Sequence, residues 1–408
     1  MSRKSLSSLR ATAVDGAVEL TFYKGAELFA ANKGTQPVRI WRRAEPGFTF
    51  GTDYREYFDD LDWRGAEMVF EGTLDCSNQR KARWVDRSVG VGFTGAYWVQ
   101  VPGDENAVGP APVRVRDPEI WWTYARLRSE AEALARDFPS AVRLDACGHS
   151  LGGRPIITLG VGPERPAIAF VGLVHAGEAG PELLLPMLRG LLSEHRDLAG
   201  QTGVAILPNL NPDEREAMAC GTPWYLRTNH NGVDLNRNFD AAWDEVSYGY
   251  GLDSSDPDAA TYRGPAPSSE PETQAAVRFI EAQRPQAVFS FHCLASICSN
   301  AFLTTAKAVG DAAFAERAVH IARAYDQGMF PENTAETRVH YACSAGSLPH
   351  WAYARFGMPA FDLELGPNPD AKACVHDGTT RAMLETYRRR HLDGLVRVLT
   401  TLRREGPP

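Results

Sequence analysis

The chain has 408 residues, of which 44% are hydrophobic and 23% are charged, and its formal net charge is −8 at pH 7. This length exceeds that of one typical domain, and the composition is that of an ordinary globular protein, so we expect two domains. The negative charge argues against nucleic acid as the main partner. The chain has neither a membrane-spanning apolar segment of about 18 residues nor the apolar stretch of a secretory signal, so we expect a cytoplasmic protein.

The seven cysteines are scattered along the chain and include no C-x-x-C pair. An odd, dispersed set of this kind argues against a structural zinc knuckle and against a disulfide framework.

The first 112 residues predict an all-β sandwich, because short runs of β-branched and aromatic residues recur between turn signals. These runs lie at residues 17–23, 38–42, 67–71 and 97–101. The segment 102–112 is dense in proline and glycine, which indicates a domain boundary. We therefore expect an N-terminal β-sandwich domain at 1–112 and a second domain at 113–408.

From about residue 118 the pattern changes to alternating helices and strands. Helices are predicted at 119–138, 181–198, 271–283, 306–327, 346–356 and 381–403. Strands are predicted at 156–161, 167–174, 203–207, 287–291 and 359–365. This alternation predicts an α/β domain with a largely parallel or mixed sheet that helices flank on both faces.

Two of the predicted strands end at residues that bind metals. The run 167–174 leads into His175, with Glu178 three residues later, and the run 287–291 leads into His292. Imidazole nitrogens and a carboxylate oxygen are zinc ligands, and a catalytic zinc site uses three protein ligands and one open position. Ligands in α/β folds bind beyond the carboxyl ends of strands, so the pattern predicts a zinc site there.

A rival prediction comes from Gly148-His-Ser-Leu-Gly152, which fits the G-x-S-x-G turn of α/β-hydrolase esterases. That turn requires a helix directly after the serine. Here Gly153-Arg-Pro155 and the predicted strand 156–161 follow instead, which disfavours an esterase.

Further motifs occur in a fixed order around the candidate ligands. They are Asn-Pro-Asp at 211–213, Asn-Gly-Val-Asp-Leu-Asn-Arg-Asn-Phe at 231–239, Tyr-Arg-Gly at 262–264, Ser-Glu-Pro-Glu at 269–272, Tyr-Ala-Cys-Ser-Ala-Gly-Ser at 341–347 and Phe-Asp-Leu-Glu-Leu at 361–365. Over about residues 120–400 this set resembles the zinc carboxypeptidases of the carboxypeptidase A/B type. The resemblance does not cover the first domain, which would be an extra N-terminal β domain of a bacterial-type enzyme.

The resemblance implies that His175, Glu178 and His292 bind one zinc ion per chain. It makes Glu364 the general base that takes the proton of the zinc-bound water. It makes Arg227 the residue that polarises the scissile carbonyl and stabilises the oxyanion.

The resemblance also implies a set of substrate-binding residues. Asn236 and Arg237 would bind the terminal carboxylate of the substrate, which a guanidinium does with two parallel hydrogen bonds. Tyr341 would close over the substrate, and Leu348 would set the side-chain preference of the pocket. The chain departs from the family at Gly177, where arginine often stands, and by one extra residue after Ser347.

We therefore expect a zinc-dependent metallocarboxypeptidase with a carboxypeptidase-like fold that cleaves the C-terminal peptide or isopeptide bond of a peptide with a free C-terminus. One alternative is a zinc amidase or deacylase of the aspartoacylase or desuccinylase kind. Another is a catalytically silent binding protein, which the retention of all three ligands and Glu364 disfavours. The sequence does not determine the natural peptide or the oligomeric state.

Overall fold

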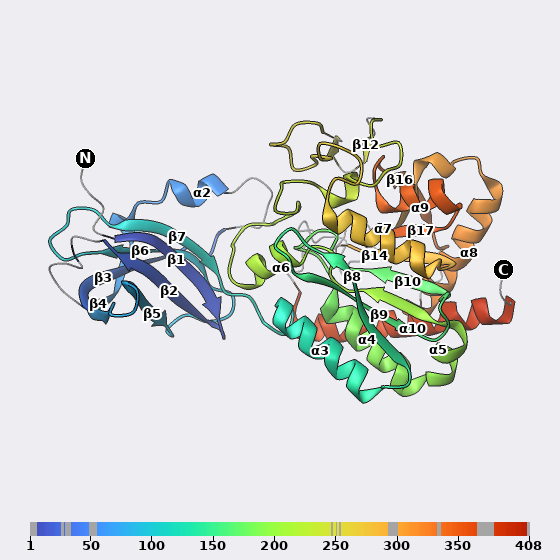
Figure 1. Ribbon diagram of the computed structural model, residues 1–408, viewed down its shortest axis with the longest axis horizontal. Coiled ribbons are helices and arrows are strands. Elements are labelled where there is room, and N and C mark those ends of the chain that lie inside the picture. The colour runs from blue at the N-terminus through green and yellow to red at the C-terminus, as the bar shows by residue number, and fades with distance from the viewer. Residues whose placement is uncertain are drawn as a thin grey trace. The chain divides into compact units, whose positions relative to one another are not determined.

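Figure 1 shows the computed structural model of the chain. It describes residues 6–25, 28, 34–48, 55–245, 248–249, 251–252, 254–292, 301–332, 336–364 and 379–405. The chain divides into two units, of which one comprises Met1–Trp121 with Ala217–Tyr225 and the other comprises Trp122–Glu216 with Leu226–Pro408. The first unit thus includes a segment from beyond residue 200 in addition to the N-terminal part of the chain.

The first unit contains two antiparallel sheets, with strand orders β1-β2-β5 and β4-β3-β6-β7. The strands are β1 (Leu6–Val14), β2 (Ala17–Lys24), β3 (Thr35–Ala44), β4 (Glu67–Asp75), β5 (Lys81–Asp86), β6 (Thr94–Gln100) and β7 (Val108–Arg114). Leu20 and Phe22 of one sheet and Ile40 and Val99 of the other are buried in the same core cluster. The two sheets therefore pack face to face, which confirms the predicted sandwich. Among its described residues, this unit also has two short helices, α2 (Arg55–Asp59) and η1 (Trp63–Gly65).

Strand β7 lies within the segment that the sequence marked as a linker. It contains Pro110 and Pro112, which lack the N–H that a central strand needs. Strand β7 is the edge strand of its sheet, where proline is tolerated. The prolines that indicated a domain boundary at 102–112 thus include two that lie in an edge strand.

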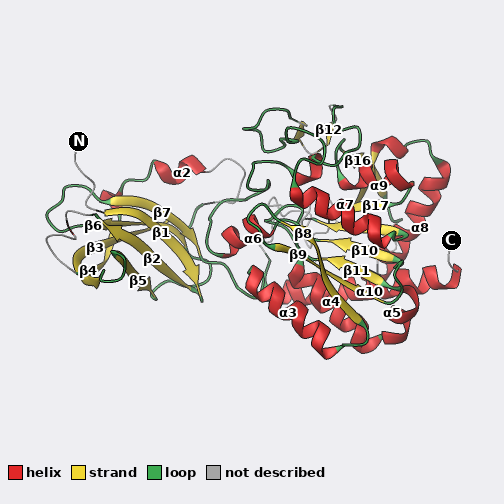
Figure 2. Ribbon diagram, viewed as in Figure 1, coloured by secondary structure: helices red, strands yellow, loops and turns green. Residues whose placement is uncertain are grey.

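The second unit has a mixed sheet with strand order β16-β15-β17-β14-β10-β11-β9-β8 among the described residues (Figure 2). The strands are β8 (Val142–His149), β9 (Pro155–Val161), β10 (Ile168–Val171), β11 (Val204–Leu207), β14 (Ala287–Phe291), β15 (Ala301–Thr305), β16 (Val339–Cys343) and β17 (Ala360–Glu364), with a small ribbon of β12 (Tyr248–Gly249) and β13 (Gly251–Leu252) apart from this sheet. Strands β11, β10, β14 and β17 are parallel neighbours, while β8, β9 and β15 also make antiparallel pairs. The predicted mixed α/β fold is confirmed.

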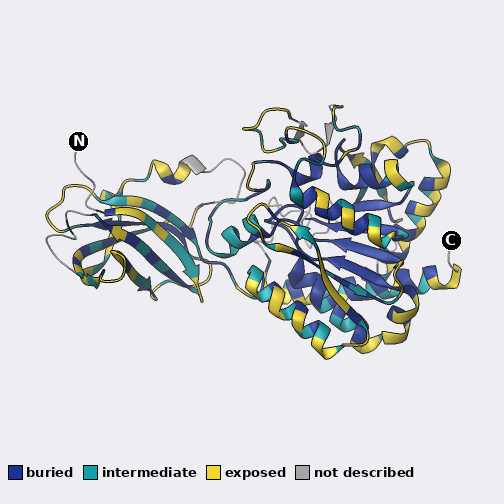
Figure 3. Ribbon diagram, in the orientation of Figure 1, coloured by how far each residue is buried: buried dark blue, intermediate teal, exposed yellow. Residues whose placement is uncertain are grey.

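Helices cover both faces of this sheet, and its central strands β10, β11 and β14 are buried, whereas the edge strand β8 is largely exposed (Figure 3). The helices after the first unit are α3 (Tyr124–Asp137), α4 (Pro181–Glu194), α5 (Arg196–Thr202), α6 (Pro212–Ala219), α7 (Pro271–Gln283), α8 (Ala312–Met329), α9 (Leu348–Phe356) and α10 (Arg381–Glu405), with single turns η2 (Leu235–Arg237) and η3 (Ala306–Ala308). Val288 and Ala360 share a core cluster with Phe279 of α7 and Trp351 of α9. On the other face, where α8 packs, Phe289 stacks on Tyr325, with their ring centroids 4.7 Å apart.

Three helix predictions differ from the structure. The predicted helix 119–138 begins only at Tyr124, where the Thr123 hydroxyl accepts a hydrogen bond from the Arg126 N–H and caps the helix. The predicted helix 181–198 is two helices, α4 and α5, because the backbone of His195, with φ/ψ of −137° and 38°, is not helical and separates them. The predicted helix 306–327 begins only at Ala312, where the carboxylate of Asp311 accepts a hydrogen bond from the Phe314 N–H and caps the helix. Along the described residues, none of the helices is both long and apolar enough to cross a lipid bilayer.

Candidate metal centre

The candidate site lies at the carboxyl ends of parallel strands, as the sequence predicts. His292 directly follows β14, and Glu364 is the last residue of β17. Phe291 and Leu363 are paired across these two strands, and the His292 N–H donates to the Leu363 carbonyl oxygen at 3.2 Å. His292 and Glu364 are therefore neighbours in register at one edge of the sheet.

The turn after β10 brings the other two candidate ligands to this edge. It leaves the strand at Gly172, where a Cβ atom would lie 2.6 Å from the Pro208 carbonyl oxygen, so only glycine fits. The turn then carries His175 and Glu178, and the Ala179 N–H donates to the His292 carbonyl oxygen at 3.3 Å. This last bond ties the turn to the strand that supplies the third ligand.

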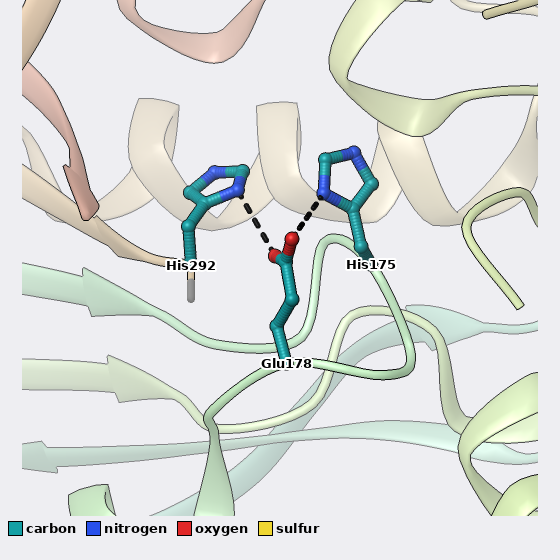
Figure 4. Close-up of side chains that lie close together, drawn as sticks. All are labelled: His175, Glu178 and His292. Carbon is teal, nitrogen blue, oxygen red and sulfur yellow. Dashed lines mark hydrogen bonds and ion pairs between the residues drawn. The ribbon is translucent and has the colours of Figure 1, made fainter. Parts of the chain in front are cut away.

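Figure 4 shows the side chains of His175, Glu178 and His292 pointing toward one another. One nitrogen or oxygen atom of each residue lies within 4.8 Å of the others, and all three residues are buried. His175 Nδ1 lies 3.0 Å from Glu178 Oε1, and His292 Nδ1 lies 3.0 Å from Glu178 Oε2. The structure thus brings together residues that are 117 positions apart, 292 minus 175, in the chain.

A second buried carboxylate faces the far nitrogen of each imidazole. Asp234 Oδ1 lies 3.1 Å from His175 Nε2, and Asp362 Oδ1 lies 3.2 Å from His292 Nε2. Metal-bound histidines commonly donate their other ring N–H to a carboxylate, which fixes the tautomer and the ring orientation. This arrangement leaves both Nδ1 atoms directed at Glu178 and available as ligand atoms.

Asp234 and Asp362 are not among the site residues predicted from the sequence, although both lie in motifs that the sequence contains. For Asp362 a signal existed, because on a strand it points to the same face as Glu364 two residues later. For Asp234 the sequence carried no comparable signal, because its partner His175 is 59 positions away.

Opposite charges and burial act against each other at this site. Burial alone would raise the pKa of Glu178, but His175 and His292 hold that pKa well below its ordinary value. Burial alone would lower the pKa of His292, but Asp362 and Glu178 raise it well above its ordinary value. The pKa of Asp234 is lowered despite burial, by Arg227 and then His175.

The donor set fits a zinc ion. Two ligand atoms that each lie about 2.0–2.1 Å from a tetrahedral ion are about 3.3 Å apart. The 3.0 Å distances from the two Nδ1 atoms to the Glu178 oxygens are close to this value. Two imidazoles and one carboxylate, each histidine with a carboxylate behind it, are the composition of a catalytic zinc site with one position left open.

Glu364 faces this cluster without being one of its three ligands. Burial raises the pKa of Glu364 to about 6, the nearby histidines oppose the rise, and the carboxylates of Glu178 and Asp362 add to it. A carboxylate with a pKa near the working pH is suited to take up and return protons.

Two of the remaining predicted site residues, Arg227 and Asn236, contact the carboxylates of Asp234 and Asp362. Arg227 Nε donates to Asp234 Oδ2 at 2.9 Å, so Arg227, Asp234 and His175 form a chain of contacts. Asn236 Nδ2 donates to Asp362 Oδ2 at 2.8 Å, and Asn236 Oδ1 accepts from the Leu348 N–H at 3.0 Å. Both ends of the Asn236 amide are therefore used inside the protein.

The other substrate-binding predictions have different surroundings. Arg237 is 4% exposed, and one of its guanidinium nitrogens donates to the Asn236 carbonyl oxygen. The side chain of Leu348 is fully buried in the core cluster beside α7. Tyr341 lies in the middle of β16, partly exposed, and burial raises its pKa. The roles of these three residues toward a substrate stay predictions.

Residues 127–383 match the zinc carboxypeptidase family, Peptidase_M14. The human carboxypeptidase N catalytic chain is 33% identical over 176 residues, which are 36% of this chain and 37% of that protein. Murein peptide amidase A of Escherichia coli strain K12 is 35% identical over 156 residues, which are 36% of this chain and 57% of that protein. The chain thus spans little more than a third of the carboxypeptidase N catalytic chain and somewhat more than half of the amidase.

Among solved structures, carboxypeptidase A from Helicoverpa armigera is similar with a TM-score of 0.55. The similarity covers 90% of this chain and 97% of that chain at 17% identity. At this identity the likeness is one of fold.

Proposed function

Because the chain belongs to the zinc carboxypeptidase family, we propose that it is a zinc-dependent metallocarboxypeptidase that hydrolyses the C-terminal peptide or isopeptide bond of peptides. The observation that carries the proposal is the buried cluster of His175, Glu178 and His292 at the same sheet edge as Glu364. A cluster of ligands alone would serve a structural metal. The additional acid/base group beside it favours catalysis.

A bound zinc ion would be held by His175, Glu178 and His292, and it would supply a Lewis acid that polarises a carbonyl and acidifies water. Glu364 then acts as general base, because its carboxylate accepts the proton of the attacking water. The same carboxyl group returns that proton to the leaving amine. Burial raises the pKa of this carboxyl group above its ordinary value, which favours the uptake of a proton from water.

The positive side chains act on the substrate. Two nitrogens of the Arg227 guanidinium, Nε and Nη2, each lie 2.9 Å from Asp234 Oδ2, which holds the guanidinium in place. In this position Arg227 would stabilise the negative charge that develops on the carbonyl oxygen of the substrate. Arg237 would bind the free carboxylate at the end of the peptide. A guanidinium–carboxylate contact in a buried site is strong and sets the orientation of the bond to be cleaved.

This proposal predicts exopeptidase specificity. Peptides that end in a free acid should have a much higher kcat/KM than the same peptides ending in an amide, because only the acid pairs with Arg237. Arg237→Met should remove most of this preference and leave both peptides as poor substrates. The measurement is a paired acid and amide peptide series with wild type and variant, after the zinc content of each has been checked.

Equal rates on acid and amide peptides with the wild-type enzyme would exclude a carboxypeptidase and leave the zinc site intact. The second candidate function is an amidase that acts on murein peptides, which the similarity to murein peptide amidase A favours. Muropeptides and linear peptides compared as substrates would separate the two functions.

A further inference from the structure

Beneath the turn that carries His175 and Glu178 lies an ion pair to which the proposed mechanism gives no role. Arg215 of α6 and Glu182 of α4 have side chains that are 0% exposed, and Arg215 Nη2 lies 3.2 Å from Glu182 Oε2. Removing two charges from water is costly, and the cost is recovered only where good geometry and further hydrogen bonds satisfy both groups. The further partners of this pair therefore indicate what it does.

Those partners are the backbone of the ligand turn. Arg215 Nη1 donates to the Ala176 and Glu178 carbonyl oxygens, at 3.1 Å each. Glu182 Oε1 accepts from the Gly180 N–H at 2.8 Å. One buried ion pair thus holds the turn at three alternate residues, and one of them is the metal ligand Glu178.

The turn also has backbone hydrogen bonds of its own, in which the Glu178 N–H donates to the His175 carbonyl oxygen and the Ala179 N–H donates to the His292 carbonyl oxygen. The side chains between the ligands add no hydrogen bonds to these. The residues next to the ligands in this turn are Ala176, Gly177, Ala179 and Gly180, whose side chains cannot form hydrogen bonds. Glycine adds backbone freedom that the folded state must restrict. A guanidinium reaches two carbonyls and one carboxylate in a fixed planar arrangement, which a lysine ammonium does not reproduce.

We infer that Arg215 is a positioning residue for the metal centre. Arg215 fixes the position of the Glu178 backbone. The Glu178 carboxylate is thereby held in place relative to the imidazoles of His175 and His292. The negative charge of Glu182 holds the Arg215 guanidinium in place, and Glu182 also accepts a hydrogen bond from the Gly180 N–H at the end of the same turn. This inference rests on the proposed zinc site and extends it to residues that touch neither metal nor substrate.

The test uses a double variant, R215M/E182Q, in the full chain. R215M alone would leave the Glu182 charge buried without its cation, whereas the double variant removes both charges and keeps an acceptor for the Gly180 N–H. We expect the zinc dissociation constant, measured by chelator competition, to rise about 10- to 100-fold, as when other groups behind metal ligands are removed. We also expect the visible absorption spectrum of the cobalt-substituted protein to change, because the ligand geometry changes.

R154M is the matched control. Arg154 pairs with Asp213 on the same helix α6, its side chain is 35% exposed, and none of its described contacts reaches the ligand turn. This variant should keep the wild-type zinc affinity and cobalt spectrum. R215K, which keeps the positive charge beside Glu182, should fold and bind zinc more weakly than wild type.

The outcomes separate the inference from the proposed function. A wild-type protein that binds no zinc would refute the proposed function itself. A wild type that binds zinc, with an R215M/E182Q variant of equal affinity and unchanged cobalt spectrum, would overturn the positioning role alone. Full zinc affinity in R215K would likewise overturn it, since a point charge would then suffice. If the double variant does not fold, the zinc affinity of R215K alone tests the inference: weaker binding than in wild type supports it, and equal binding overturns it.

Discussion

At the scale of single residues, the metal centre contains three kinds of side chain. These are the metal ligands, the carboxylates that contact the ligands from behind, and the acid/base group Glu364. Each imidazole lies between the Glu178 carboxylate and one further carboxylate, Asp234 or Asp362. Asp362 also accepts hydrogen bonds from Asn236 and from the Cys343 thiol, so it joins the metal centre to the segment proposed to bind the substrate. Single substitutions can therefore be chosen to change either the affinity for zinc or the rate of hydrolysis.

Glu364→Gln should retain zinc and lose activity. The amide fills the same volume and lies outside the proposed ligand set, but it cannot accept a proton from water. Loss of a general base lowers kcat by about 10²–10⁴-fold. The measurement is kcat together with metal content by elemental analysis. A variant with near wild-type kcat on any substrate that the native enzyme cleaves would remove Glu364 from the mechanism.

Asp362→Asn should weaken zinc binding while the fold persists. The amide loses the negative charge that faces His292 Nε2, so the orientation and basicity of that ligand are less well defined. We expect an approximately 10- to 100-fold increase in the zinc dissociation constant. Chelator competition measures the constant, and thermal unfolding of the metal-free protein serves as the folding control. An unchanged constant would show that Asp362 contributes only to packing.

At the scale of elements, the face of the sheet opposite the metal centre is an aromatic layer. Phe170, Phe289 and Phe361 are paired in register on β10, β14 and β17. Phe170 and Phe289 pack against Tyr325 of α8, and Phe361 stacks on Phe289. His391 of α10 enters the same layer, with its Nδ1 2.9 Å from the Tyr325 hydroxyl. Because strand residues alternate between faces, this layer directs Asp362 and Glu364 to the metal side.

His391 should make the protein less stable in mild acid. Burial lowers its pKa to about 3, against about 6.5 in the unfolded chain, so between these values the unfolded state binds a proton that the folded state does not. Stability therefore falls as the pH decreases from about 6.5 toward 3, by about 2 kcal/mol from this group at pH 5 relative to pH 8.

His391→Asn offers the Tyr325 hydroxyl an amide oxygen in place of Nδ1 and does not titrate. The loss of thermal stability between pH 8 and pH 5 should be smaller in this variant than in wild type. Comparison of the unfolding temperatures of both proteins at the two pH values measures the difference. Identical losses would mean that His391 does not contribute to the acid sensitivity.

At the scale of the whole molecule, the chain contains two units with separate cores, and the ligand cluster belongs to one of them. Zinc removal should therefore destabilise that unit alone. A ligand at 100 times its dissociation constant stabilises the folded state by about 2.7 kcal/mol. Calorimetry with and without a chelator should show one transition that moves to lower temperature and one that does not.

Equal shifts of both transitions would show that the units unfold as one, and no shift would show that the cluster binds no metal. His175→Ala provides the control, because it should lose most of the zinc and its transition should then be insensitive to the chelator.

The fold class, the long helices of the second unit, the strands β9, β10, β11, β14 and β17, and the candidate ligands were predicted from the sequence alone. These depend on local properties, namely the period of apolar residues, the capping of helices and the position of His175 and His292 after strands. Where a local signal was ambiguous the predictions were incomplete. Proline in β7 indicated a linker although it lies on a sheet edge. The strands that were not predicted are β1, β5, β8, β12, β13, β15 and β16.

The residues that support the ligands could be identified only from the folded chain. Asp362 and Asn236 are 126 positions apart, and Arg215 and Glu182 are 33 apart, so no local pattern records that they pair. The same holds for Ala217–Tyr225, which belongs to the first unit although its neighbours in sequence belong to the second. The physical reason is that hydrogen bonds and ion pairs depend on distance in space, and the packing of the sheet and helices sets that distance.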